Sequence, residues 1–168
     1  MTFVSARAIR NPFFCYNNFM DKNTLLSQLE ALLSAETDPV ANMANTAALL
    51  YHGLTGLNWV GFYLLKEGGL VLGPFQGKPA CVRICVGRGV CGTAVQLRKT
   101  VCVPDVHLFP GHIACDSASQ SELVIPLIKN GVILGVLDMD SPHKNYFSQE
   151  DRAFFEKAAE ILLKNCCF

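Results

Sequence analysis

Cysteines and carboxylates are the residues of this 168-residue chain that could do chemistry together. Cys81, Cys91 and Cys115 fall in glycine-rich or polar segments, where a thiol can reach solvent and a second thiol can approach it. Cys91 directly precedes a predicted short helix, whose N-terminus favours a thiolate. Three such thiols predict redox exchange. The other cysteines are interpreted as packing or tail residues: Cys15, Cys85, Cys102, Cys166 and Cys167.

Two carboxylates stand close together near the end of an apolar run. Asp138 and Asp140 are two residues apart on a predicted strand, so their side chains leave the same face. Whether Glu122 joins them depends on the hairpin at Asn130-Gly131: a strict two-residue turn pairs position 123 with Asp138 and turns Glu122 away. A three-residue loop with a bulge at the glycine pairs Glu122 with Asp138 and unites the acids, and we favour it.

Three neighbouring carboxylates have a chemical consequence. They cannot all ionise cheaply, so at least one pKa is expected to rise and to supply a proton near neutral pH. The alternative interpretation is that acids at the end of a strand face water and take no part in chemistry.

Aromatic side chains line another predicted strand. Trp59, Gly61 and Tyr63 alternate along it and share one face. Gly61 leaves a gap between two amphipathic rings, which suits a flat or thioether-sized group, including one that bears a cation. Ordinary core packing is the alternative interpretation.

Two further patterns are weaker. His107, His112 and Cys115, with Cys81 or Cys91, could bind zinc, but no pair has the close spacing of known zinc sites. The string GRGVCGTA has the glycines of a phosphate loop and lacks its Gly-Lys-Ser/Thr ending. The sequence therefore predicts neither a metal nor an organic cofactor.

Composition limits the class of protein. A length of 168 residues predicts one domain, over residues 21–168, after an N-terminal extension over residues 1–20. Fourteen basic residues balance 14 acidic ones, which argues against a nucleic-acid or membrane-surface protein. No apolar stretch is long enough to span a bilayer. Eight cysteines without the framework of a small secreted protein favour a reducing, cytoplasmic location.

The extension itself has two interpretations. Arg7 and Arg10, with no acidic residue nearby, give it a faint likeness to an organelle transit peptide. The favoured interpretation is a poorly ordered tail or a short segment packed by Phe13 and Phe14.

The elements that position these residues follow from periodicity and from turn and capping residues. Helices are predicted over 23–35, 39–53, 92–98 and from 148 onward, and strands over 58–65, 70–72, 81–86, 100–103, 122–129 and 132–140. Residues 73–92 are predicted to be mostly loop, and 104–121 an unusually long one. The pattern predicts an α+β domain: a central antiparallel sheet with helices on one face and a ligand pocket under loops on the other.

Several long strings make the chain similar to the free methionine-(R)-sulfoxide reductases, which are single GAF domains. They are NWVGFYLL, GPFQGKPAC, VGRGVCGTA, GHIACDSASQSE and GVLDMDSP. The resemblance extends over roughly Asp21 to Leu163. It implies a GAF-like fold, reduction of free methionine-(R)-sulfoxide to methionine, and thioredoxin as the reductant. Members of the family are often homodimers, and the sequence leaves the oligomeric state of this chain open.

The resemblance also implies roles for the cysteines. Cys115 corresponds to the nucleophile, Cys81 to the resolving thiol and Cys91 to a third redox cysteine. The nucleophile is oxidised to a sulfenic acid, which then condenses with a second thiol to an intramolecular disulfide. Cys85 is only four residues from Cys81, so the division of roles among Cys81, Cys85 and Cys91 stays open.

The resemblance gives the remaining site residues a part in substrate binding. Trp59 and Tyr63 would form the pocket wall around the methyl and sulfur end of the substrate. Glu122, Asp138 and Asp140 would bind its sulfoxide or amino group. A closed pocket that engages both the α-amino and α-carboxylate groups would select the free amino acid.

Two other functions compete with this hypothesis. The second is a non-enzymatic GAF sensor that binds a small ligand, such as a cyclic nucleotide, in the same pocket. A sensor domain normally sits in a longer chain with an output module, for which 168 residues leave no room. The third is a zinc-binding structural module.

Overall fold

A computed structural model describes residues 21–113 and 116–168. In that part of the chain, six strands form one antiparallel sheet in the order β3-β2-β1-β6-β5-β4. The strands are β1 (Trp59–Lys66), β2 (Gly69–Gly77), β3 (Arg83–Cys85), β4 (Val101–Val103), β5 (Ser121–Lys129) and β6 (Val132–Ser141). The helices are α1 (Lys22–Leu33), α2 (Pro39–Gly53), α3 (Gly89–Leu97) and α4 (Gln149–Asn165), with a 3-10 turn over Val106–Leu108. The α+β prediction is confirmed.

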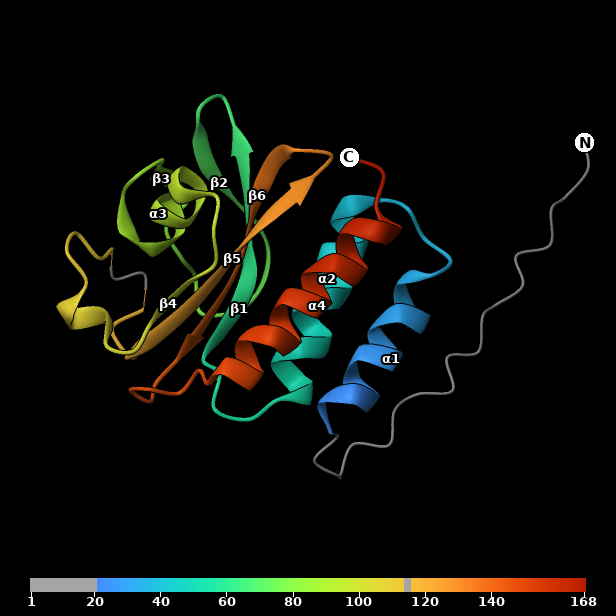
Figure 1. Ribbon diagram of the computed structural model, residues 1–168, viewed down its shortest axis with the longest axis horizontal. Helices are drawn as coiled ribbons and strands as arrows, with labels where there is room; N and C mark the ends of the chain where they lie inside the picture. Colours follow the sequence, from blue (N-terminus) through green and yellow to red (C-terminus); the bar gives the residue numbers. More distant parts are fainter. Residues whose placement is uncertain (1–20, 114–115) are drawn as a thin grey trace, which may run out of the picture.

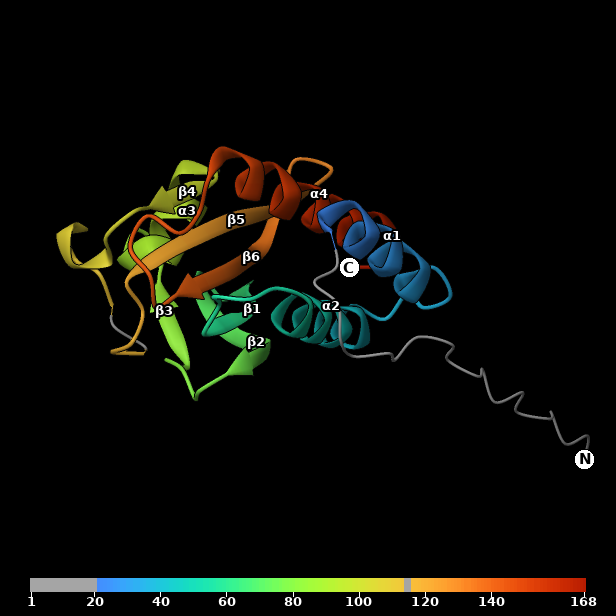
Figure 2. The same cartoon turned by 90° about the horizontal axis from the view of Figure 1, so that it is seen from below.

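Three helices cover one face of the sheet (Figure 1). Helix α2 packs on β1 and β2, α4 packs on β5, and α1 packs on both helices from outside. Figure 2 shows the same layers from below. Alternate residues of β1 separate the two sides of the sheet: Val60 and Phe62 join the core under these helices, whereas Trp59 and Tyr63 join a second core against α3. The predicted helical face is confirmed, and α3 shares the opposite face with the expected pocket.

Side-chain caps fix where the helices begin. The carboxylate of Asp21 accepts hydrogen bonds from two backbone N–H groups of α1, and that of Asp38 accepts one from α2, which has Pro39 in its first turn. Ser148 and Asp151 form a reciprocal capping box at the start of α4. Helices α1, α2 and α4 therefore begin within about one residue of the predicted positions.

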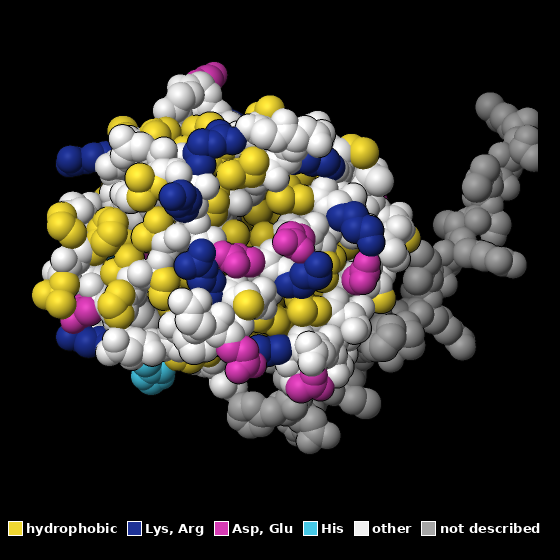
Figure 3. Space-filling view, in the orientation of Figure 1, with side chains coloured by type: hydrophobic (Ala, Val, Ile, Leu, Met, Phe, Trp, Pro, Cys, Tyr) yellow, Lys and Arg dark blue, Asp and Glu magenta, His cyan; other side chains and the backbone are white. Residues whose placement is uncertain are grey.

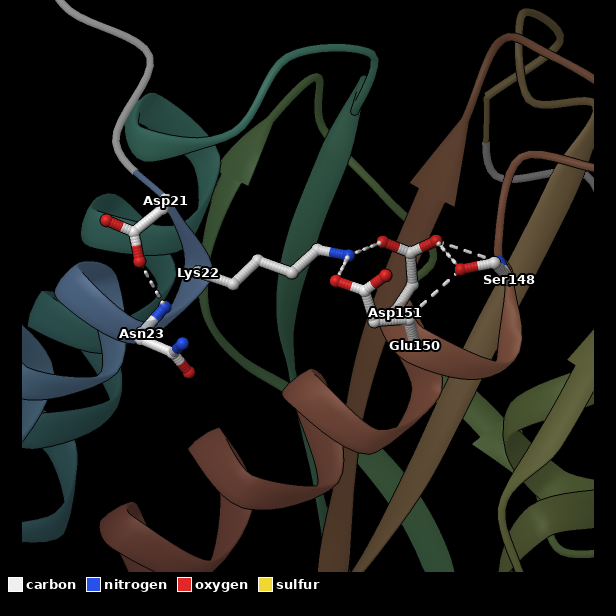
Figure 4. A network of polar contacts seen from close by, with 6 residues as sticks. All are labelled: Asp21, Lys22, Asn23, Ser148, Glu150 and Asp151. Carbon is white, nitrogen blue, oxygen red and sulfur yellow. Dashed lines mark hydrogen bonds and ion pairs between the residues drawn. The ribbon is translucent and has the colours of Figure 1, made fainter.

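Lys22 joins the first turn of α1 to the first turn of α4 (Figure 4). Its Nζ lies 3.2 Å from Oε1 of Glu150 and 2.9 Å from Oδ1 of Asp151. The other oxygen of Asp151 accepts from the backbone N–H of Ser148 at 2.8 Å. Exposed ion pairs contribute only about 0–1 kcal/mol each, so this network mainly sets how α1 lies along α4.

The hairpin between β5 and β6 differs from the prediction in the position of its bulge and in the residue opposite Glu122. Asn130 and Gly131 form a two-residue turn with φ of 51° and 78°, so the predicted bulge in the loop is wrong. The pairing register shifts inside the strands instead, between Leu127 and Ile128, with the extra residue in β6. Glu122 therefore lies opposite Asp140. The predicted pairing of Glu122 with Asp138 is therefore wrong, because Asp138 lies opposite Val124. The three acids still come together as expected, through a bulge at a different position.

Strand β2 is longer than predicted because its glycines allow close packing within the sheet. An added Cβ at Gly73 would lie 3.1 Å from the carbonyl oxygen of Phe62, and one at Gly77 would lie 2.7 Å from that of Asn58. Gly77 pairs with Trp59, so the strand reaches the far end of β1. The glycines that predicted a loop from residue 73 belong to a paired strand.

The surface shows no extended field of one charge on the side seen in Figure 3, where basic and acidic side chains are interspersed. Within residues 21–113 and 116–168, no helix is both long enough and apolar enough to cross a membrane.

Candidate active site

A cavity of about 20 Å³ lies on the α3 side of the sheet. Side chains from β3, α3, β5, β6 and the loop before β5 line it: Ile84, Gly89, Val90, Cys91, His112, Ile113, Asp116, Ser119, Glu122, Asp138 and Asp140. Two of these, Ile113 and Asp116, flank Ala114 and Cys115 in the sequence. Cys115, the predicted nucleophile, lies outside the described residues, as do Cys15 and the rest of residues 1–20.

The three predicted acids all line this cavity. Glu122, Asp138 and Asp140 are 6%, 6% and 9% exposed. Burial raises the pKa of Asp138 to about 7. Burial, and then repulsion from neighbouring carboxylates, raises the pKa of Glu122 and of Asp140 well above their ordinary range. The cluster therefore holds protons at neutral pH, as predicted, and the alternative of acids facing water is excluded.

Cys91 is buried against this cluster. It lies in the first turn of α3, and its Sγ is 3.2 Å from Oδ2 of Asp138 and 3.9 Å from Oε1 of Glu122. Burial, followed by the charge of Asp138, raises the pKa of the Cys91 thiol well above its usual range. The prediction of a solvent-accessible thiolate favoured by the helix N-terminus is therefore wrong for Cys91. Desolvation and carboxylate repulsion outweigh the helix dipole, so the residue is a neutral thiol that donates to Asp138.

Cys81 and Cys85 have different surroundings. Cys81 is partly buried and packs against the apolar cluster that includes Cys91. Cys85 is exposed at the end of β3, whereas the preceding residue, Ile84, lines the cavity. Successive residues of a strand point to opposite sides, so Cys85 faces away from the cavity.

The remaining described cysteines fit the packing and tail interpretation only in part. Cys166 is buried, as that interpretation requires. Cys102 and Cys167 are exposed, and Cys167 belongs to the C-terminal tail. The packing interpretation is therefore wrong for Cys85 and Cys102. Both are exposed, on the short strands β3 and β4, and lie outside the core.

The gap expected at Gly61 is filled by its neighbours. An added Cβ there would lie 2.5 Å from Cη2 of Trp59 and 2.4 Å from Cβ of Phe75. The Trp59 ring stacks on Phe75 at 5.4 Å and on Tyr63 at 6.0 Å between centroids. The glycine makes room for the tryptophan of its own strand and not for a ligand, so that expectation is wrong.

Trp59 and Tyr63 lie beside the cavity and are not among its lining residues. Nε1 of Trp59 donates to the carbonyl of Lys78 at 3.1 Å, and the Tyr63 hydroxyl donates to the carbonyl of Cys81 at 2.9 Å. Both rings therefore hold the segment that carries Cys81. Their role as walls around a substrate stays a prediction.

Asp116 is a site residue that the sequence analysis missed. Its carboxylate accepts hydrogen bonds from the Ala118 backbone at 2.9 Å, and from Lys78 and Asn58 at 3.2 Å each. The backbone bond from Ala118, with those from Lys78 and Asn58, lowers the pKa of Asp116, so this acid stays ionised. The signal in the sequence is its position directly after Cys115.

Of the two histidines considered as zinc ligands, only His112 lines the cavity. His112 lines the cavity, with Nε2 3.7 Å from Oε2 of Glu122, and burial lowers its pKa. His107 is not among the lining residues. Among the described residues, the potential metal ligands that gather within 4.8 Å of one another are Cys91, Glu122 and Asp138.

Comparison with known proteins agrees with this fold. The sequence pattern of the GAF domain matches residues 29–162. The free methionine-R-sulfoxide reductase of Escherichia coli (strain K12) is 60% identical over 121 residues, 72% of this chain and 73% of that protein. Its namesake in Saccharomyces cerevisiae is 42% identical over 165 residues, 91% of this chain and 92% of that protein.

A solved structure gives the same result in three dimensions. The X-ray structure of free methionine-R-sulfoxide reductase from Neisseria meningitidis in complex with its substrate superposes with a TM-score of 0.83 and 49% identity, over 86% of this chain and 87% of that one. The predicted resemblance is thereby confirmed. The chain belongs to the GAF domain family and, within it, to the free methionine-R-sulfoxide reductases.

Proposed function

We propose that this chain reduces free methionine-R-sulfoxide to methionine with electrons from thiols. One observation carries the proposal: a small cavity holds buried carboxylic acids, among them Asp138 with a pKa of about 7, next to a thiol. Sulfoxide reduction needs a proton for the departing oxygen, and such an acid supplies one near neutral pH. The names of the Escherichia coli and Saccharomyces cerevisiae relatives support the same reaction.

The first chemical step is an oxygen transfer, for which we assign the nucleophile to Cys115. Its thiolate attacks the sulfoxide while an acid of the cluster protonates the oxygen. The bond between oxygen and the substrate sulfur breaks, and that sulfur keeps the electron pair and leaves as methionine. A new bond joins the oxygen to Sγ of Cys115, which becomes a sulfenic acid, so the cysteine is oxidised by two electrons.

The second step regenerates the enzyme. The thiol of Cys81 attacks the sulfenic sulfur of Cys115, water leaves and a disulfide forms. An external dithiol, for which we propose thioredoxin, reduces that disulfide by exchange. Cys91 is the third thiol of the proposal, and it lies in the apolar cluster against which Cys81 packs. Its raised pKa suits a reserve partner and not the attacking group.

Recognition of the substrate falls to the acids and the aromatic rings. An ionised carboxylate among Glu122, Asp138 and Asp140 would pair with the α-ammonium group, while a protonated one serves the sulfoxide. Trp59 and Tyr63 would lie against the methyl and sulfur end. A methionine inside a protein has no α-ammonium group, so the cluster selects the free amino acid.

The test is NADPH oxidation coupled through thioredoxin reductase and thioredoxin. Three substrates are compared: free methionine-R-sulfoxide, its S epimer, and an R-sulfoxide within a blocked peptide. We expect turnover of the free R epimer alone. Absence of turnover with that epimer, or equal rates with both epimers, would overturn the proposal.

Two sets of variants assign the roles. Cys115→Ser should abolish turnover, and Cys102→Ser, which replaces an exposed thiol on β4, should keep it. Asp138→Asn and Asp140→Asn should lose activity while the number of titratable thiols stays unchanged. If neither acid variant loses more than a few-fold, the acids are structural.

A further inference from the structure

We propose that the carboxylate cluster also binds a thiophilic divalent cation, with Zn²⁺ as the biological candidate, in the place of the substrate. The ligands are Sγ of Cys91 and one carboxylate oxygen each from Glu122 and Asp138. Bound in this way, zinc is a reversible inhibitor that competes with the sulfoxide. The inhibition rests on the proposed function, whereas the binding does not.

The first argument is geometric. In a tetrahedral zinc site, bonds of about 2.3 Å to sulfur and about 2.1 Å to oxygen put those two ligand atoms about 3.6 Å apart. Sγ of Cys91 is 3.2 Å from an oxygen of Asp138 and 3.9 Å from an oxygen of Glu122. The two distances bracket the required one, so an ion needs only small side-chain shifts.

The second argument is an unsatisfied atom. Oδ1 of Asp138 is buried and accepts from no N–H group, hydroxyl or thiol of the described residues, although Oδ2 accepts from Cys91. Asp138 is 6% exposed and lines the cavity. A buried carboxylate oxygen without a donor is costly, so the site is poised for a cation or a donor supplied from outside.

The third argument is charge. Within the described residues, no lysine or arginine forms an ion pair with Glu122, Asp138 or Asp140. The nearby Lys78 pairs with Asp116. A thiolate and two carboxylates carry three negative charges, and a dication leaves only one uncompensated.

The donor set selects the class of metal. A thiolate with carboxylates suits zinc and other thiophilic ions, whereas magnesium and calcium prefer oxygen alone. His112 offers a fourth donor, because it lines the same cavity and its Nε2 lies 3.7 Å from Oε2 of Glu122.

The binding test uses the reduced, full-length chain without external thiols. Equilibrium dialysis against ZnCl₂, with a chromophoric chelator as competitor, should find one ion per chain that Cys91→Ser and Asp138→Asn each weaken by about tenfold or more. The matched controls Cys102→Ser and Cys167→Ser remove exposed thiols and should bind zinc as the wild type does. Circular dichroism verifies that each variant is folded. No bound zinc, or affinity unchanged in both site variants, overturns the proposal.

The inhibition test measures methionine formed in a single turnover, because thioredoxin or dithiothreitol would itself bind zinc. Zinc should raise the half-saturating concentration of free methionine-R-sulfoxide without lowering the amplitude at saturation, and EDTA should reverse the effect. An amplitude that excess substrate cannot restore overturns the shared site. A chain that binds zinc through Cys91 and Asp138 but reduces no sulfoxide refutes the proposed function alone. A chain that reduces the sulfoxide but binds no zinc refutes only the metal site.

Discussion

Nζ of Lys78 lies 3.2 Å from Oδ1 of Asp116, and this ion pair joins the two segments that carry the proposed catalytic thiols. Lys78 is three residues before Cys81, and Asp116 directly follows Cys115. The Asp116 side chain is 6% exposed, whereas that of Lys78 is 68% exposed. The carboxylate of Asp116 is thus buried, and the Lys78 side chain contacts it from the solvent side.

We expect Lys78→Met to slow disulfide formation between the two segments. An ion pair whose lysine is exposed to solvent contributes up to about 1 kcal/mol, which corresponds to a rate about fivefold lower at most. Lys144→Met is the matched control, because Lys144 pairs with Asp105 at 2.7 Å, at the other end of the same loop. Loss of free thiols after one turnover measures the rate. Equal slowing in both variants would show that Lys78 acts only through general stability.

Asp138→Asn should change how stability depends on pH. The folded pKa of Asp138 is about 7 and its ordinary value is 3.8, so the folded state binds a proton that the unfolded state has released between these values. The stabilising contribution of Asp138 is therefore greatest below its ordinary pKa and is lost as the pH rises toward 7. Asparagine does not titrate, so the variant should gain stability relative to the wild type across this window, by on the order of 4 kcal/mol at most.

Urea unfolding of both proteins at pH 4 and pH 8 measures this difference. Asp105→Asn is the control with the opposite sign, because the hydrogen bond from Lys144 lowers the pKa of Asp105. The contribution of Asp105 is present above its ordinary pKa and is lost as the pH falls. The free energy of unfolding of Asp138→Asn, measured relative to that of the wild type, should rise from pH 4 to pH 8. If it does not rise, the Asp138 carboxyl is not protonated in the folded state.

Cys81→Ser and Cys85→Ser should separate two thiols that are only four residues apart. Cys81 packs toward the second core, whereas Cys85 is exposed and points away from the cavity. We expect Cys85→Ser to keep steady-state turnover within about twofold. Cys81→Ser should accumulate a sulfenic acid, which a dimedone adduct seen by mass spectrometry detects. A dimedone adduct that accumulates in Cys85→Ser and not in Cys81→Ser would reverse the assignment.

Gly92→Ala should destabilise the protein although it lies within a helix. An added Cβ would lie 2.3 Å from the carbonyl oxygen of Cys85 and 3.1 Å from the backbone nitrogen of Gly87. Overpacking typically costs about 1–3 kcal/mol, which exceeds the gain of up to about 1 kcal/mol from replacing glycine by alanine in a helix. Gly69→Ala is the control, because its nearest contact would be an ordinary 3.6 Å. Thermal unfolding measures both variants, and a stabilised Gly92→Ala would refute the close approach of α3 to β3.

The sequence by itself determined the features that depend on neighbouring residues. The period of the apolar residues located the helices and strands, and Asp38 and Ser148 marked where α2 and α4 begin. The two-residue period of a strand placed Asp138 and Asp140 on one face. Long shared strings identified the family, which was confirmed. Each of these signals is local, so a single strand or turn of chain contains it.

Only the tertiary structure decided which groups meet and which are desolvated. The shift between Leu127 and Ile128 set Glu122 opposite Asp140, although the turn alone predicts another register. The Trp59 ring fills the space over Gly61. The position of α3 places Cys91 against the carboxylate of Asp138 and not toward solvent. Burial and pKa depend on surfaces contributed by segments far apart in the chain, and spacing along one segment contains no information about them.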